Sequence, residues 1–261
     1  MSETRYILLS FDVEEFDIPL EYGQAISPDE QMQVGYNGLV ETMNIIDRLN
    51  IEATFFTTAN FASHYPEAVK TISQMHEIAS HTFYHSHFAT KDLANSKALL
   101  EAITGKTVAG LRMPRMQAAN TNDVAKAGYT YDSSINPTWL PGRYNNLRLP
   151  RTIYNDKTIL RLPSSVTPIF RIPLFWLSFK NFPYPIYRQW VKNTLKKDGY
   201  VCLYFHPWEF VELKKYNIPA YLKRGAGPTL QNKLKRLIND LKCEGEVISI
   251  QRYLRCVHKN W

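Results

Sequence analysis

With 261 residues, of which 44% are hydrophobic, the chain is long enough to bury a sizeable core. Its formal net charge of +7 comes mostly from basic pairs scattered over the second half. They lack the basic stripe with interleaved aromatic residues that nucleic-acid-binding proteins show. We therefore expect no nucleic-acid partner, whereas anionic lipid headgroups or a phosphate-bearing carrier fit the charge.

No linker divides the chain, so we expect a single domain over residues 1–261. The start runs from Met1 into a strand-like segment at Tyr6, without the apolar core and cleavage site of a secretory signal, and this predicts a cytoplasmic protein. The cysteines have no Cys-x-x-Cys spacing, so we expect reduced core thiols at Cys202, Cys243 and Cys256.

Short apolar runs alternate with amphipathic stretches, which is typical of a parallel sheet with crossover helices. The predicted strands are 6–11, 53–57, 77–79, 110–112, 130–131, 159–162, 200–205 and 246–248. The predicted helices are 37–49, 60–74, 90–104, 121–127, 186–197, 230–242 and 249–257. This pattern predicts an α/β barrel or a doubly wound sheet, and in either fold the chemistry gathers at the carboxyl ends of the strands.

Residues 163–188 interrupt the pattern with five prolines among aromatic residues. Proline disfavours a long helix, and the segment is too short to span a bilayer. We interpret it as a proline-rich cover packed on the barrel, with a flexible lip against substrate or membrane as the alternative.

Acidic residues follow the first predicted strand, in the segment Ser10-Phe-Asp-Val-Glu-Glu-Phe-Asp17. Under strand periodicity Asp12 and Glu14 share a face. One carboxylate can then bind a metal while the other acts as a general base, because a nearby cation keeps a carboxylate ionised. An acidic, solvated turn is the alternative interpretation.

Histidines cluster next, with His76, His81, His85 and His87 within twelve residues. His81 and His85 are four residues apart, a spacing that presents two imidazoles to one metal ion on one turn of helix. Such a pair needs a further carboxylate or histidine to complete a site. We assign no role to His76 and His87.

Three further strand ends carry polar side chains: Arg112-Met-Pro-Arg115, Tyr131-Asp132, and His206 before Pro207. An arginine beside a carboxylate can fix its orientation through a charge-assisted bond. His206 follows a buried strand, where a lone histidine is more often structural. Its position on the same rim as a base and a metal pair favours catalysis.

At these motifs the sequence resembles the polysaccharide deacetylase family, carbohydrate esterase family 4, from residue 6 to about residue 209. The five matching motifs, in order, are Ser10-Phe-Asp12, His76-Glu-Ile-Ala-Ser-His81-Thr-Phe-Tyr-His85, Arg112-Met-Pro-Arg115, Tyr131-Asp132-Ser-Ser134 and Phe205-His206-Pro207. The resemblance implies a distorted (β/α) barrel with about seven strands.

The resemblance also implies the site residues and the cofactor. Asp12 would be the general base, oriented by Arg112, and His206 the general acid. Asp132 would position the acid-side groups, and the backbone N–H of Arg115 would help to hold the oxyanion. His81 and His85 would bind a divalent metal, zinc first, with cobalt or nickel as alternatives.

Two positions depart from the family pattern. Val13 stands where the family commonly has a metal-binding aspartate, so we assign the third ligand to Glu14, with Glu15 as the rival. The Asp-Val-Glu-Glu start resembles an intracellular or exopolysaccharide-associated subgroup. Arg115 replaces a common aromatic residue, and its charge would suit an anionic sugar or a carrier phosphate.

The leading hypothesis is a metal-dependent hydrolase that removes N-linked acetyl groups from an amino sugar of a cell-envelope or surface polysaccharide, or of its lipid-linked precursor. A metal-independent, allantoinase-like cyclic-amide hydrolase of the same fold is one alternative. Another is a catalytically silent carbohydrate-binding protein that stacks sugars on Phe170, Trp176 and Tyr184. A glycosidase that pairs Asp12 with Glu14 or Glu209 would leave the histidines without a role.

The basic, aromatic end of the chain, residues 252–261, is expected to pack its apolar face on the barrel. Peripheral contact with the inner membrane leaflet is the alternative hypothesis. The sequence leaves the oligomeric state open.

Overall fold

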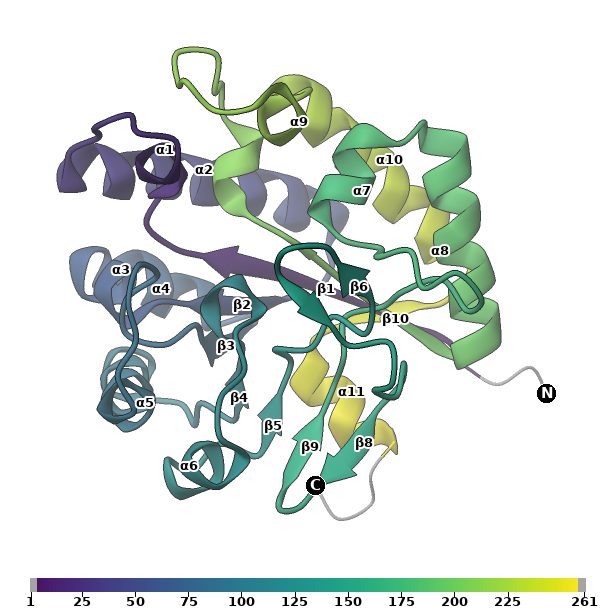
Figure 1. Ribbon diagram of the computed structural model, residues 1–261, viewed down its shortest axis with the longest axis horizontal. Coiled ribbons are helices and arrows are strands. Elements are labelled where there is room, and N and C mark those ends of the chain that lie inside the picture. The colour runs from purple at the N-terminus through teal and green to yellow at the C-terminus, as the bar shows by residue number, and fades with distance from the viewer. Residues whose placement is uncertain (1–3, 258–261) are drawn as a thin grey trace.

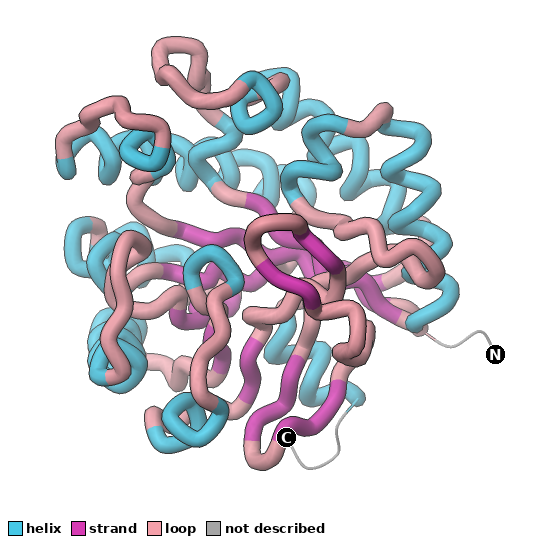
Figure 2. The backbone as a smooth tube through the Cα atoms, viewed as in Figure 1, coloured by secondary structure: helices cyan, strands magenta, loops and turns pink. Residues whose placement is uncertain are grey.

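The computed structural model describes residues 4–257 and contains one large, curled, mostly parallel sheet. Its order is β10-β1-β2-β3-β4-β5-β9-β8, and β11 pairs with the first half of β1. A separate two-stranded hairpin, β6–β7, stands in front of this sheet (Figure 2). The strands are β1 (Tyr6–Val13), β2 (Thr54–Thr57), β3 (Glu77–Ser80), β4 (Gly110–Leu111), β5 (Tyr131–Asp132), β6 (Trp139–Leu140), β7 (Tyr144–Asn145), β8 (Tyr154–Asp156), β9 (Ile159–Arg161), β10 (Tyr200–Phe205) and β11 (Glu246–Ile248).

Parallel pairing brings the carboxyl ends of the main strands to one edge. β1 pairs with β10 from Tyr6 opposite Tyr200 to Phe11 opposite Phe205, and with β2 through Val13 opposite Thr57. Among the described residues, β8 is the one strand of this sheet that runs antiparallel. Beyond β9, the amide of Ser165 donates to the carbonyl of Cys202 at 2.9 Å, which draws the chain back to β10. The result is the predicted distorted barrel.

Helices cover the outside of the sheet, with α2 to α6 along one half and α7 to α10 along the other (Figure 1). They are α1 (Ile18–Glu21), α2 (Pro28–Leu49), α3 (Ala59–His64), α4 (Pro66–Ile72), α5 (Lys91–Thr104), α6 (Thr121–Lys126), α7 (Trp176–Asn181), α8 (Tyr184–Asp198), α9 (Ala220–Lys223), α10 (Pro228–Lys242) and α11 (Ile250–Val257). Short 3-10 turns occupy Pro114–Met116 and Pro207–Phe210. No helix within residues 4–257 has the length and apolar character needed to cross a membrane.

Helix α2 lies directly behind the functional edge because two of its positions lack side chains. It begins at the cap Ser27, whose hydroxyl accepts from the amide of Glu30. A Cβ at Gly35 would lie 2.5 Å from the carbonyl oxygen of Glu14, and one at Gly38 would lie 2.2 Å from that of Pro207. Glycine therefore allows the helix to approach both the loop after β1 and the turn after β10.

Each predicted strand is present, within two residues at either end. The predicted helix 60–74 is instead two helices, because Pro66 has no N–H to continue the first and begins the second. The prediction for 37–49 missed the first turns of α2. The sequence pattern also missed β6, β7, β8 and the short helices α1, α7 and α9. The residues of β6, β7 and β8 are exposed or half-buried, so these strands lack the apolar run that marks a buried strand.

Residues 163–188 combine buried and exposed parts. Leu174 and Phe179 are buried, as expected of a cover, while Ile169 and Phe170 at a loop tip are 82% and 81% exposed. Of the three residues in the predicted sugar-stacking surface, only Trp176 lines the main cavity among the described residues. Trp176 lies in the pocket, whereas the hydroxyl of Tyr184 donates to Asp240 at 2.6 Å.

The structure also bears on the predictions for the cysteines and for the C-terminal stretch. Cys202 is a buried thiol as expected, but Cys243 and Cys256 are exposed. In α11, Tyr253 and Leu254 are buried against the sheet, as predicted for the apolar face of the C-terminal stretch. Residues 258–261, and Met1 to Glu3 at the start, lie outside the described residues.

Candidate active site

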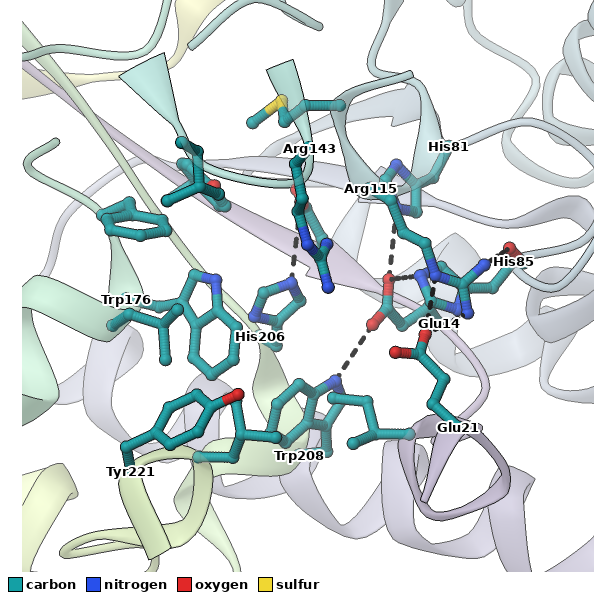
Figure 3. A pocket seen from close by; sticks show the side chains of 18 of the residues that line it. Glu14, Glu21, His81, His85, Arg115, Arg143, Trp176, His206, Trp208 and Tyr221 are labelled. Carbon is teal, nitrogen blue, oxygen red and sulfur yellow. Dashed lines mark hydrogen bonds and ion pairs between the residues drawn. The ribbon is translucent and has the colours of Figure 1, made fainter. Parts of the chain in front are cut away.

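A cavity of about 330 Å³ opens at the carboxyl edge of the sheet. Its floor carries Asp12 and Glu14 after β1, His81 and His85 after β3, and His206 after β10. Figure 3 shows Glu14, His81 and His85 on one side of the cavity and His206 on the other. The parallel register brings them together, although they are separated by almost 200 positions in the chain.

Glu14, His81 and His85 form the one group within residues 4–257 whose geometry suits a metal ion. Their donor atoms lie within 4.8 Å of one another, and all three residues are buried. Oε2 of Glu14 is 3.1 Å from Nε2 of His81 and 3.3 Å from Nε2 of His85. One carboxylate and two imidazoles with further open positions are a donor set typical of catalytic zinc sites.

Each of these three side chains has a second hydrogen-bonding contact, through an atom outside the donor set. Nδ1 of His81 lies 2.8 Å from the carbonyl of Arg112, and Nδ1 of His85 lies 2.8 Å from Oδ1 of Asp17. The indole N–H of Trp208 donates to the other oxygen of Glu14 at 3.0 Å. Bonds of this kind leave each Nε2 free to face a cation, so the residues present fit a divalent metal.

The two histidines do not lie on a helix, contrary to one of our expectations. They occupy the loop between β3 and α5, where Thr82 adopts a positive φ of 63°. The amide of Ala59 donates to the carbonyl of Thr82, and that of Asn60 donates to Phe83. The N-terminus of α3 therefore fixes the loop that carries both imidazoles.

The remaining acidic and histidine candidates point elsewhere. Glu15, the rival ligand, accepts from the hydroxyl of Thr58 at 2.7 Å and from the side-chain amide of Asn60 at 2.6 Å. His76 is buried beside Phe55, and His87 bonds with Ser86. Glu14 therefore faces the two histidines, whereas Glu15 faces the N-terminus of α3.

Charges within the donor set are strongly coupled. Burial disfavours a charged imidazole, but the carboxylates of Glu14 and Asp17 outweigh it and raise the pKa of His85 to about 9. Burial would likewise favour neutral Glu14, yet the histidines around it lower its pKa. Without a cation a proton therefore balances these charges, and metal binding would release it.

Asp12 lies beside this group and has a different partner. Nη1 of the fully buried Arg112 donates to Oδ1 of Asp12 at 2.6 Å and also to the hydroxyl of Ser10 at 2.9 Å. The guanidinium lies over the ring of Phe56, 4.0 Å from its centroid. Oδ2 of Asp12 is 4.0 Å from Nε2 of His206. Arg112 thus holds one oxygen of Asp12, and the other faces the cavity.

Asp132 is placed differently from our expectation. It pairs with Arg161 and accepts from the hydroxyl and amide of Ser134. Ser134 in turn accepts from the amide of Met113 at 2.8 Å. Within the described residues, none of the hydrogen bonds or ion pairs of Asp132 reaches His206. Asp132 therefore supports the backbone that leads to Arg115, because it holds Ser134 and Ser134 binds the amide of Met113.

Arg115 lies at the cavity wall, but its charge is already balanced. Nη2 is 2.6 Å from Glu21 and 3.3 Å from Asp17, and Nη1 donates to the carbonyl of His85 at 3.2 Å. The expectation that this arginine offers a spare charge to an anion is therefore wrong. Its φ of 55° instead marks a left-handed turn in the backbone after Pro114.

Around His206 the structure adds residues that sequence motifs missed. The imidazole stacks on Trp208 with centroids 4.9 Å apart and meets Trp176 edge-on at the same distance. Its Nδ1 is 3.2 Å from Oε1 of Glu209, whose Oε2 is 3.0 Å from the buried ammonium of Lys180. The spacing His206-x-x-Glu209 could have signalled this pair, whereas no sequence pattern links Lys180 to it.

This environment favours the protonated acid. Burial lowers the pKa of His206, but Glu14, Glu209 and Asp12 together raise it above its ordinary value. Burial would also favour neutral Glu209, and Lys180 and His206 reverse that by lowering its pKa. A carboxylate held ionised behind an imidazole suits a general acid that must be charged before it donates.

Comparisons with known families agree with this arrangement. Residues 34–131 match the family model described as polysaccharide deacetylase, and residues 133–245 match a model described as a domain of unknown function, DUF3473. The first match contains His81, His85 and Arg115, while Asp12 precedes it and His206 follows it. The match bears out the predicted enzyme class, a hydrolase that acts on amide bonds.

Solved structures share the fold at low sequence identity. A structure described as a polysaccharide deacetylase from Mycobacterium smegmatis is 18% identical, covering 100% of this chain and 92% of its own, with a TM-score of 0.70. One from Pseudomonas aeruginosa PAO1 is 16% identical, covering 98% and 93%, with a TM-score of 0.68. Puue allantoinase is 15% identical, covering 98% and 92%, with a TM-score of 0.67. These likenesses confirm the distorted barrel, and no curated protein matches the chain in sequence.

Proposed function

We propose that the chain removes the acetyl group from the nitrogen of an amino sugar in a cell-envelope or surface polysaccharide, or in its precursor. The observation that carries the proposal is the buried donor set of Glu14, His81 and His85 beside Asp12 and opposite His206. A ligand set, a base and an acid around one cavity are the groups that amide hydrolysis requires. The match of residues 34–131 to polysaccharide deacetylases supports the substrate class.

A divalent cation, zinc first and cobalt or nickel as alternatives, would be held by Glu14, His81 and His85. When bound, it would polarise the acetyl carbonyl and acidify water in the cavity. Asp17 and the carbonyl of Arg112 would keep both imidazoles in the tautomer that such a cation needs.

Catalysis then needs two proton transfers. Asp12, oriented by its ion pair with Arg112, takes the proton of the attacking water through its cavity-facing oxygen. The backbone N–H of Arg115 contributes a hydrogen bond to the negative oxygen that develops on the former carbonyl. His206 gives its proton to the sugar nitrogen as the C–N bond breaks, and acetate and the free amine leave.

The same proposal covers the organisation and location of the protein. Strands from residues matched by both family models share one sheet, which supports a single catalytic domain over residues 1–261. We place the protein in the cytoplasm, at the inner face of the membrane when the substrate is lipid-linked. We also propose that the chain belongs to the subgroup of polysaccharide deacetylases whose first motif is Asp-Val-Glu-Glu.

Metal analysis tests the proposal. The purified protein should bind about one zinc or cobalt ion per chain, and it should release acetate from N-acetylglucosamine oligomers. His81→Asn should abolish both properties, because one of three ligands is lost. His87→Asn is the matched control, since His87 lies in the same loop and bonds with Ser86 instead. Full activity after chelation and removal of the metal would contradict the proposal.

Two alternatives predict different outcomes. A cyclic-amide hydrolase, for which the likeness to Puue allantoinase is the supporting observation, would open cyclic ureides and leave acetylated sugars intact. A silent carbohydrate-binding protein would bind glycans equally well in Asp12→Ala and turn over no acetylated substrate. Assaying both substrate types in the presence and absence of metal separates the three functions.

A further inference from the structure

The hairpin β6–β7 carries an arginine into the cavity. Leu140, Pro141, Arg143 and Tyr144 from this hairpin all line the cavity. The turn closes with the amide of Arg143 donating to the carbonyl of Leu140 at 3.0 Å, and Gly142 supplies the positive φ of 77° that the turn needs. Arg143 therefore follows directly after the tip, where its side chain can reach over the active site.

Its guanidinium points into the cavity, between His206 and the donor set (Figure 3). The two other arginines at this site are paired, Arg112 with Asp12 and Arg115 with Glu21. No ion pair of Arg143 occurs among residues 4–257. Arg143 is thus the cationic side chain at the cavity whose charge the protein leaves unbalanced.

The neighbourhood of Arg143 also offers uncharged hydrogen-bonding groups. The hydroxyls of Tyr22 and Tyr221 lie 3.3 Å apart, and both residues line the same cavity. A guanidinium beside phenolic hydroxyls is suited to a carboxylate or phosphate, because it offers paired N–H donors in the plane of two oxygens. A neutral sugar would leave this charge without a partner.

We propose that Arg143 binds an anionic group of the substrate, a carboxylate or a phosphate next to the acetamido group. This inference rests on the proposed deacetylase function and narrows its substrate to an acidic amino sugar or a glycosyl phosphate. The positive charge that we expected at Arg115 for substrate binding is thus supplied by Arg143 of the hairpin. Arg115 instead holds the loop that carries His85, because it donates to the carbonyl of that residue.

The experiment compares three probes that share an acetamido group. They are a neutral N-acetylglucosamine oligomer, an oligomer of N-acetylglucosaminuronic acid, and N-acetylglucosamine 1-phosphate. Arg143→Gln should raise KM for an anionic probe about 10- to 100-fold and leave the neutral probe unchanged, because a charge-assisted pair is lost. Arg143→Lys should recover part of the binding. Arg148→Gln is the matched control, since Arg148 is exposed outside the cavity lining.

The two anionic probes distinguish the sources of the charge. A preference for the uronic acid identifies a carboxylate, and a preference for the sugar phosphate identifies a carrier. Equal KM values for neutral and anionic probes in the wild type would overturn the inference, as would an equal loss on all three probes in Arg143→Gln.

Calorimetric binding of the same probes separates this inference from the proposed function. Anionic probes that bind through Arg143 without turnover would support the anion site and refute the deacetylase. Deacetylation of all probes without dependence on Arg143 would support the deacetylase function and refute the anion site. Thermal melting of each variant confirms that the exposed hairpin position leaves the fold intact.

Discussion

The two walls of the cavity hold their histidines by different means. On the metal-binding wall, His81 and His85 are each bonded through Nδ1 to an oxygen 2.8 Å away. On the acid wall, His206 is stacked on Trp208 and meets Trp176 edge-on, and its Nδ1 has a longer contact, 3.2 Å, with Glu209. A metal ligand needs one fixed tautomer, whereas a general acid must exist with and without its proton. Polar bonds serve the first purpose, and apolar packing fixes a ring without fixing its charge.

We expect the largest effect from replacing Asp12, and this variant tests whether Asp12 acts as the base or as a metal ligand. Asp12→Asn should lower kcat about 10²- to 10⁴-fold through loss of the base. Its metal content should stay near one ion per chain, because Asp12 pairs with Arg112 and lies outside the donor set. Acetate release and elemental analysis measure the two effects.

Two further variants, Glu14→Gln and Glu15→Gln, are the controls for the metal content of Asp12→Asn. Glu14→Gln should lose the metal, while Glu15→Gln should retain metal and activity because the Glu15 side chain bonds with Asn60 of α3 and with its cap Thr58, away from the donor set. Loss of metal in Asp12→Asn would assign Asp12 to the metal-binding wall and contradict the division drawn above.

The next largest effect concerns the support of a ligand. Asp17→Asn should weaken metal affinity about 10- to 100-fold, since the bond to Nδ1 of His85 loses its charge. Competition with a chelator of known affinity measures this change. Glu21→Gln is a useful comparison, because it also removes a carboxylate from Arg115 without touching a histidine. Equal losses in both variants would show that Asp17 acts through Arg115.

The smallest effect is a shift in pH dependence. Glu209 helps to raise the pKa of His206, so Glu209→Gln should lower that pKa. Because His206 must be protonated to donate, activity falls as pH rises through its pKa, and the alkaline limb of kcat should move to lower pH. A pH–rate profile of wild type and variant measures the shift. An unchanged alkaline limb would mean that another group is the acid.

Stability provides the control for that variant. Removing Glu209 leaves the ammonium of Lys180 buried without its partner, which costs about 3–5 kcal/mol. Adding Lys180→Met to Glu209→Gln should restore much of the melting temperature and keep the shifted pH limb. This double variant separates folding from acid strength.

Local sequence patterns were sufficient to predict the main strands of the sheet and the polar residues on the floor of the cavity. Apolar runs such as Tyr200–Phe205 identified the strands, because a strand buried on both faces needs a continuous hydrophobic segment. The polar residues after them, including Asp12 and His206, were then placed on one edge by the rule for parallel strands. The hairpin β6–β7 escaped detection because its residues are exposed or half-buried and form no apolar run, unlike the equally short but buried strands β4 and β5.

What the sequence by itself determined is therefore the order of the strands along the chain and the residue types at their ends, because hydrophobic periodicity and motif spacing are local properties. Tertiary structure alone decided which charges meet. It paired Arg115 with Glu21, set Lys180 behind Glu209, and left Arg143 facing the cavity. Ion pairing depends on distances of a few ångströms between segments far apart in the chain, and such distances exist only after the sheet has curled and the helices have packed.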